Sequence, residues 1–124
     1  MNKCLLAGLL LFNVFSGHAQ GVTRTDLQRH DLSIPGREAL QVIVGFGPGV
    51  VAPAHKHPGE EIIYVLEGTL EYTVDGKAKT YKAGEALIIP AGVVHSAKNV
   101  GSGHAAELAT YVVEKGKPLV VLVQ

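Results

Sequence analysis

The chain has 124 residues, which suits one domain and is too short for two ordinary hydrophobic cores. Its 11 lysine and arginine residues balance 11 aspartate and glutamate residues, so the formal net charge at pH 7 is zero. This balance argues against a nucleic-acid partner, because such a partner would require a basic face.

The first segment, residues 1–19, has the features of a secretory signal peptide. Lys3 supplies positive charge, and residues 4–15 form an apolar stretch that is shorter than the roughly 20 residues needed to span a bilayer. Gly17 and Ala19 are small residues of the kind that signal peptidases recognise, so we expect cleavage after Ala19. The alternative interpretation is an N-terminal anchor or a buried helix.

Cleavage at this point would remove Cys4, the only cysteine of the chain. We therefore expect an exported protein without disulfides, held together by its core alone. The short basic start of the segment fits export to a bacterial periplasm, with no membrane attachment after cleavage.

The next segment, residues 20–39, is polar and contains one Pro35-Gly36 turn, which predicts a short strand or an irregular arm. From Leu40 onward the chain consists of short runs rich in β-branched residues, separated by glycine, proline and aspartate. We expect strands within residues 40–46, 48–55, 61–67, 69–74, 77–82, 85–90, 106–116 and 118–124.

The clearest local signal is a β-hairpin around Asp75-Gly76. Residues 69–74 alternate between apolar and polar types before this dipeptide, and residues 77–82 return as a polar, exposed strand. No segment keeps a helical period for about ten residues, so the sequence predicts an all-β sandwich or barrel over residues 40–124.

Two histidines and a carboxylate occur together in HKHPGEEIIYVLEG, residues 55–68. Residues two apart in a strand face the same side, which places His55 with His57 and, if the intervening turn keeps the phase, with Glu61. Burying these groups without a partner would cost several kcal/mol, and a cation would remove that cost. By itself, however, a His-x-His pair is more often a surface or capped pair.

A second stretch, GEALIIPAGVVHSAKN over residues 84–99, carries another histidine. The first stretch has the spacing Gly49, five residues, His55-x-His57, three residues, Glu61, six residues, Gly68. The second has the spacing Gly84, five residues, Pro90-x-Gly92, two residues, His95, three residues, Asn99. Both stretches resemble the two signature motifs of the cupin superfamily, without departure from either pattern.

The resemblance implies an all-β fold of the cupin type, a double-stranded β-helix or jelly-roll barrel similar to the RmlC-like cupins. In cupins the four motif ligands bind one divalent metal, and here they correspond to His55, His57, Glu61 and His95. The resemblance also implies turn positions with positive φ at Gly68, Gly84 and Gly92, and a turn-fixing role for Asn99.

Three imidazoles and one carboxylate form a mixed nitrogen and oxygen set that suits Fe, Mn, Ni, Cu or Zn and is too rich in nitrogen for Ca or Mg. Up to two positions of an octahedral ion would stay open to a ligand. His30 and His104 fall outside both motifs and are expected at the surface, and Glu60 is expected on the solvent side of its strand.

The barrel interior is expected to be aliphatic, with the candidates Val42, Val44, Ile63, Val65 and Ile88. Val44 and Ile63, with Tyr72 and Tyr111 as polar handles, are the candidates for a ligand pocket; plain packing is the alternative role for either tyrosine. No second acid or base group occurs at motif spacing, which weakens the case for an enzyme.

Three hypotheses follow for the function. The first is a metal-dependent enzyme, a dioxygenase or a sugar-type isomerase, that acts on a small oxygenated molecule. The second is a non-catalytic periplasmic cupin that binds a small molecule or the metal, and the third treats the metal as a structural staple. We also expect a homodimer in which residues 20–39 and 119–123 cover exposed sheet edges, although residues 119–123 could equally form an internal strand.

Overall fold

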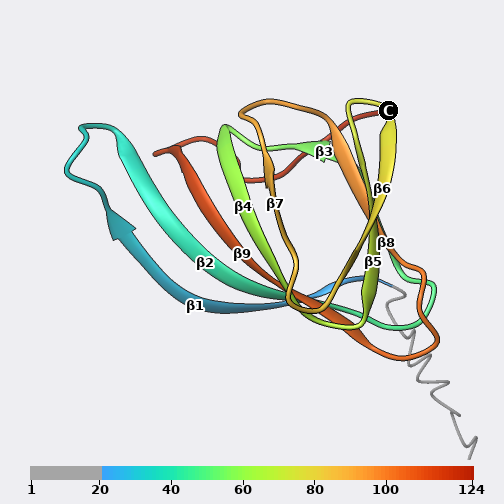
Figure 1. Cartoon of the computed structure of the whole chain (residues 1–124). Coiled ribbons are helices and arrows are strands. Elements are labelled where there is room, and N and C mark those ends of the chain that lie inside the picture. Colours follow the sequence, from blue (N-terminus) through green and yellow to red (C-terminus); the bar gives the residue numbers. More distant parts are fainter. Residues whose placement is uncertain (1–20) are drawn as a thin grey trace, which may run out of the picture.

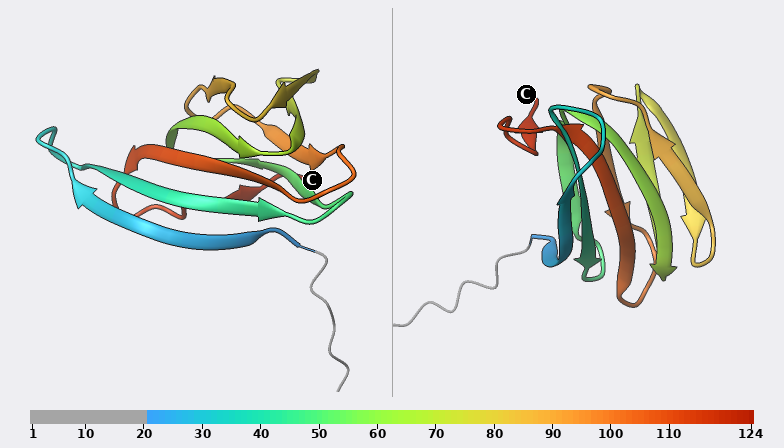
Figure 2. Two further views of the ribbon diagram at one scale, coloured as in Figure 1. Left: turned by 60° about the horizontal axis from the view of Figure 1, so that its bottom comes forward. Right: turned by 90° about the vertical axis from the view of Figure 1, so that its left-hand side faces the viewer.

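The computed structural model describes residues 21–124, so the segment expected to be a signal peptide, residues 1–19, lies outside the described part of the chain. Within it, two five-stranded antiparallel sheets face each other (Figures 1 and 2), which confirms the all-β prediction. The strands are β1 (Thr23–Asp31), β2 (Arg37–Phe46), β3 (Val51–Lys56), β4 (Gly59–Glu67), β5 (Thr69–Val74), β6 (Lys77–Lys82), β7 (Ala86–Ile89), β8 (His95–Asn99), β9 (Ala105–Glu114) and β10 (Val121–Leu122). No helix within residues 21–124 is long and apolar enough to cross a membrane.

The strand order places sequence-distant strands side by side. The first sheet runs β1-β2-β9-β4-β7 and the second runs β10-β3-β8-β5-β6. Strand β2 pairs with β9, and β3 pairs with β8, so strands from the early and late parts of the chain lie side by side. The two metal-motif stretches therefore meet through long-range strand pairs rather than through one local hairpin.

The predicted hairpin between β5 and β6 is confirmed. Asp75 and Gly76 have φ angles of 49° and 78°, and Val74 lies opposite Lys77 across the turn. Two successive residues with positive φ form the type of two-residue turn that matches the twist of paired strands. The other predicted turn glycines, Gly68, Gly84 and Gly92, have φ angles of 75°, 91° and 72°.

Burial follows the expected alternation, with one correction. Val42, Val44, Ile63 and Val65 are buried in the core as predicted, but Ile88 is 58% exposed. The prediction for Ile88 is wrong because β7 aligns Ile89, not Ile88, with the inward-facing Glu61 of β4. A shift of one residue in a strand moves every side chain to the opposite face.

The polar segment at residues 20–39 forms a strand and not an irregular arm. β1 pairs with β2 along its length, and the turn between them includes Gly36 with a φ of 77°. Every residue of β1 is exposed, and the hairpin extends past the other strands (Figures 1 and 2). β1 is therefore the outer edge of the first sheet.

The C-terminal residues form less structure than the sequence predicts. β10 contains two residues, which pair with Lys56 and His55 of β3. It lies at the edge of the second sheet and both residues are exposed, so the alternative of an internal strand is wrong.

Gly59 begins β4 at a point where two backbones approach closely. A Cβ atom at this position would lie 2.0 Å from the carbonyl oxygen of Val112 and 2.7 Å from the Cα of Val113. Both are backbone atoms of β9, which cannot yield without distorting the strand pair. Only glycine therefore allows β4 to pass this point and carry Glu61 inward.

Replacing Gly59 with alanine is expected to lower the free energy of unfolding by at least about 2 kcal/mol, because of this backbone clash. Urea denaturation followed by circular dichroism measures the change. Gly103→Ala is the matched control, since a Cβ atom there would meet no heavy atom within 4 Å. Equal midpoints for both variants would contradict the role assigned to Gly59.

Candidate metal centre

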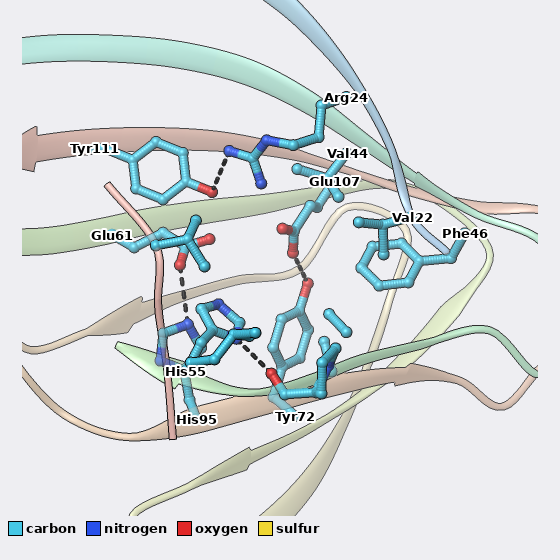
Figure 3. A pocket seen from close by; sticks show the side chains of 15 residues that line it. Val22, Arg24, Val44, Phe46, His55, Glu61, Tyr72, His95, Glu107 and Tyr111 are labelled. Carbon is cyan, nitrogen blue, oxygen red and sulfur yellow. Dashed lines mark hydrogen bonds and ion pairs between the residues drawn. The ribbon is translucent and has the colours of Figure 1, made fainter. Parts of the chain in front are cut away.

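The four motif residues come from both sheets and converge on one place in the barrel interior; Figure 3 shows His55, Glu61 and His95 of this group. His55 lies in β3, directly opposite His95 at the start of β8. His57 follows the end of β3, and Glu61 enters from β4 in the other sheet. The group thus bridges the two sheets.

The cluster is compact and largely withdrawn from solvent. One ligand atom from each of the four residues lies within 4.8 Å of the others. His57, Glu61 and His95 are each 3% exposed, and His55 is half-buried. The ring centroids of His55 and His95 are 4.2 Å apart, which leaves the imidazole edges facing a shared space.

Backbone carbonyls fix the same ring nitrogen in all three histidines. Nδ1 lies 2.6 Å from the Pro53 oxygen in His55, 2.6 Å from the Leu119 oxygen in His57, and 3.0 Å from the Val93 oxygen in His95. A carbonyl oxygen can only accept, so each Nδ1 must carry the proton. In a neutral ring the Nε2 atom is then a bare lone pair, which is the form that binds a metal.

Two of these Nε2 atoms lie against the Glu61 carboxylate, and that of His57 has no hydrogen-bond partner. Glu61 Oε2 lies 3.1 Å from His95 Nε2 and 2.9 Å from His57 Nε2. His57 Nε2 is buried, and no hydrogen bond of acceptable geometry satisfies it. A neutral ring carries no proton on Nε2 that it could donate to Glu61. In that form the Nε2 lone pair faces the Glu61 carboxylate, and a cation bound between the two groups would satisfy both.

The ionisation states also fit a metal. Burial alone would raise the pKa of Glu61, but hydrogen-bond donation and positive charge from His57 and His95 outweigh it and bring the pKa to about 2; a bound cation would supply the same positive charge in place of protons on these rings. Burial lowers the pKa of His55, and the neighbouring His95 and His57 rings add to this effect against the hydrogen bond to Pro53. A carboxylate and neutral imidazoles are the forms that metal binding requires.

With this geometry, the comparison with known families is decisive. Residues 42–114 match the Cupin_2 family, a cupin domain. The chain belongs to the cupins. Both signature motifs lie within these matched residues, so the family match agrees with the resemblance inferred from the motifs.

Among curated relatives, this cupin is 40% identical over 87 residues to germin-like protein subfamily 2 member 2 of Arabidopsis thaliana, covering 63% of the chain and 40% of the relative. The chain thus spans well under half the length of that relative. Among solved structures, it is similar to an oxalate oxidase in complex with the substrate analogue glycolate, at 27% identity and a TM-score of 0.68, covering 86% of this chain and 57% of that one. A double-stranded β-helix protein from Klebsiella pneumoniae has a TM-score of 0.70 at 22% identity, covering 86% and 87% of the two chains, and shows the shared fold.

A cavity of about 230 Å³ opens beside the histidine cluster of this cupin. Of the residues expected to form a pocket, Val44, Tyr72 and Tyr111 line it. Ile63 is buried in the core and is not among the lining residues. Both tyrosines are also 1% exposed, so they pack in the core and present a hydroxyl to the cavity at the same time.

The hydroxyl groups of the two tyrosines have different partners. Tyr111 accepts a hydrogen bond of 3.2 Å from Arg24 Nη2, and its ring packs edge-on against His57 at 4.8 Å. Tyr72 donates a hydrogen bond to Glu107 (Figure 3). Burial raises the pKa of both tyrosines, so both hydroxyl groups keep their protons.

Glu107 is the site residue that sequence reasoning missed. It lines the cavity and is 4% exposed, so a second acid or base group is present outside both motifs, where the search at motif spacing did not look. Burial raises the pKa of its carboxyl group to about 8, the Glu61 charge adds to the rise, and Tyr72 and Arg24 oppose it. The available signal was parity, since Glu107 shares the buried face of β9 with Ala105, Ala109, Tyr111 and Val113.

The remaining motif and non-motif residues behave largely as expected. His30 and His104 are exposed and lie outside the cluster. Glu60 is half-buried on the opposite side of β4 from Glu61. Asn99 fixes the end of β8, because its Nδ2 donates to the carbonyls of Phe46, Gly47 and Gly103 and its Oδ1 accepts from the Gly101 amide.

The raised pKa of Glu107 predicts a pH-dependent stability that Glu107→Gln should remove. Between pH 4.5 and about 8 the unfolded carboxyl group has lost its proton while the folded one keeps it. The unfolded state therefore binds fewer protons, and the free energy of unfolding falls as pH rises, by at most about 1.4 kcal/mol per pH unit.

The stability of Glu107→Gln relative to the wild type should therefore increase with pH across this window and level off above it. Urea titrations at several pH values, at equal metal content, measure this difference. Asp26→Asn is the control, since Asp26 is exposed in β1. A difference between Glu107→Gln and wild type that does not vary with pH would contradict the prediction.

Proposed function

We propose that this cupin binds one divalent transition metal through His55, His57, Glu61 and His95. The observation that carries the proposal is the set of three Nδ1 hydrogen bonds to backbone carbonyls, which leaves the three Nε2 atoms free for a metal, with those of His57 and His95 lying 2.9 and 3.1 Å from Glu61 Oε2. The alternative of a surface or capped His-x-His pair does not account for the buried, unsatisfied Nε2 of His57.

The donor set suits Fe, Mn, Ni, Cu or Zn, because imidazole and carboxylate together match ions of intermediate hardness. When bound, such an ion supplies a Lewis acid, or an oxygen-binding centre if it is redox-active. The chain itself supplies the fixed tautomers, the Glu61 charge and a largely buried setting that excludes bulk water.

We further propose that the ligand is a small oxygenated molecule. A cavity of about 230 Å³ lies below the usual size of pockets for drug-sized ligands, so it favours a compact molecule. The similarity to an oxalate oxidase that holds glycolate supports a small oxygenated acid in particular. The tyrosine hydroxyls and Glu107 provide hydrogen-bonding groups opposite the metal ligands.

The reaction class best supported is an oxidation of the dioxygenase or oxidase type, with isomerisation of a sugar-like substrate as the other enzymatic candidate. Glu107 and Tyr72 favour an enzyme, because they can hold or move a proton beside the ligand. A protein that retains metal and ligand without turnover would instead be a binding protein. A lower melting temperature on chelation, without any ligand bound, would indicate a structural metal.

We also propose export to a bacterial periplasm after removal of residues 1–19. The support is the basic start, the apolar stretch and the small residues at the cleavage position. Export matters for the metal, since outside the cytoplasm the affinity order among competing ions has more influence on which ion is bound.

Metal analysis tests these proposals together. Protein recovered from the periplasmic fraction without added metal is expected to contain about one transition-metal ion per chain and, by intact mass, to begin at Gln20. His57→Ala is expected to lose at least about tenfold in metal affinity, because one of four ligands is gone.

His104→Ala is the matched control, since His104 is exposed and outside the cluster. Fe or Mn at one equivalent directs the search to oxygen consumption, whereas Zn, Ni or Cu directs it to Lewis-acid chemistry or binding. The four-ligand site would be overturned if neither the wild type nor His57→Ala contained metal.

A homodimer is also part of the proposal. β1 is exposed along its whole length at the edge of the first sheet, and Leu27 within it is 49% exposed. An exposed strand edge presents unpaired backbone groups that can pair with another chain.

Light scattering after size exclusion is expected to give a dimer for the wild type and a shift toward monomer for Leu27→Lys. Thr80→Lys, at an exposed position of β6, should leave the mass unchanged. A monomeric wild type would refute the dimer.

A further inference from the structure

Glu107 is a buried carboxyl group that the four-residue metal site does not use. It enters the cavity from β9, between the histidine cluster and the apolar end lined by Val22 and Phe46 (Figure 3). A carboxyl group on the buried face of a strand costs stability unless hydrogen bonds or a paired charge compensate for the lost water. Its presence in the cavity therefore raises the question of what it binds.

The partners of Glu107 do not neutralise a negative charge. The hydrogen bond from Tyr72 is the one side-chain hydrogen bond that its carboxyl group makes within residues 21–124. The nearest guanidinium belongs to Arg24, whose Nη2 donates to Tyr111. An ionised Glu107 would therefore be a buried charge beside Glu61, so the neutral acid is the stable form.

The hydrogen bond from Tyr72 also determines where the proton of the neutral acid lies. Tyr72 donates to Oε2, so the acid proton belongs on Oε1. In Figure 3 this second oxygen points away from Tyr72, toward the side on which Glu61 and Tyr111 lie. A hydrogen-bond donor is therefore available to whatever occupies the cavity.

We propose that Glu107, oriented by Tyr72, is a second ligand-binding group of the cavity and donates a hydrogen bond to an oxygen of a small carboxylic acid held at the metal site. The proposal rests on the proposed metal function. It adds a specificity residue outside both cupin motifs, with Tyr72 as its positioning residue.

The charges in the cavity select the ligand. A divalent ion and the Arg24 guanidinium together exceed the single negative charge of Glu61, so an anion is favoured when Glu107 is neutral. The ligand needs two oxygens for the open metal positions and a third that accepts from Glu107. A 2-hydroxy acid such as glycolate meets this requirement within a cavity of about 230 Å³.

Glycolate binding to protein carrying one equivalent of Co²⁺ tests the proposal, with visible absorption of the ion and calorimetry as readouts. Glu107→Leu should bind glycolate at least about tenfold more weakly, because a hydrogen bond to a charged oxygen is lost. Glu107→Gln keeps a donor in the same place and should stay within about threefold of wild type. Tyr72→Phe should weaken binding by a few fold, and Tyr64→Phe, at an exposed position of β4, should not change it.

The Co²⁺ affinity must be unchanged in every variant, which separates loss of the ligand contact from loss of the metal site. Equal glycolate affinity in Glu107→Leu, tighter binding by Glu107→Gln, or no glycolate binding by Co²⁺-loaded wild type overturns the inference alone. A wild type that takes up no Co²⁺ overturns the proposed function and this inference with it.

If Glu107→Leu does not fold, infrared difference spectroscopy tests whether Glu107 is protonated and whether it donates to the ligand. The wild type should show the carbonyl band of a protonated carboxylic acid at neutral pH, and the band should be absent in Glu107→Gln. Glycolate should shift this band if Glu107 donates to the ligand. A band that is missing, or that glycolate does not move, contradicts the proposal.

Discussion

The rest of the site depends on one constraint: a carboxylate and three imidazoles are buried together where the two sheets meet. None of these groups can be satisfied by the others alone, since each histidine directs its proton outward to a carbonyl. The close approach of β4 to β9 at Gly59 brings Glu61 into this position. The fold thus holds several electron-pair donors close together. This arrangement is unfavourable by itself, and a bound cation would make it favourable.

The cavity then separates two carboxyl groups into opposite states. Positive charge beside Glu61, from its histidine neighbours or from a bound cation, favours its ionised form, whereas burial and the Glu61 charge disfavour ionisation of Glu107. Two carboxyl groups whose pKa values are pushed apart by their surroundings are a common basis for dividing acid and base roles in one site. The half of the cavity proposed to bind the metal and the half that contains Glu107 are therefore physically distinct.

The sequence was sufficient for the features that depend on local spacing. The clustering of the four motif residues followed from two motifs, and the β5–β6 hairpin followed from Asp75-Gly76, because both signals are contained in a few neighbouring residues. Ile88 was misplaced because the burial phase of β7 is set by its register with β4, which a short apolar run does not reveal. Glu107 was missed because its meaning depends on Tyr72, 35 residues earlier, on a strand of the other sheet.

The hydrogen bond from His57 to the Leu119 carbonyl links the centre to one of the least secured segments of the described chain. The adjoining strand, β10, contributes two exposed residues and one narrow pairing with β3, so it can detach at a small cost while both sheets remain intact. Detachment frees the His57 ring to rotate and to exchange its tautomer. We therefore expect the residence time of an ion at the proposed site to follow the fraying of this tail and not the global stability of the barrel.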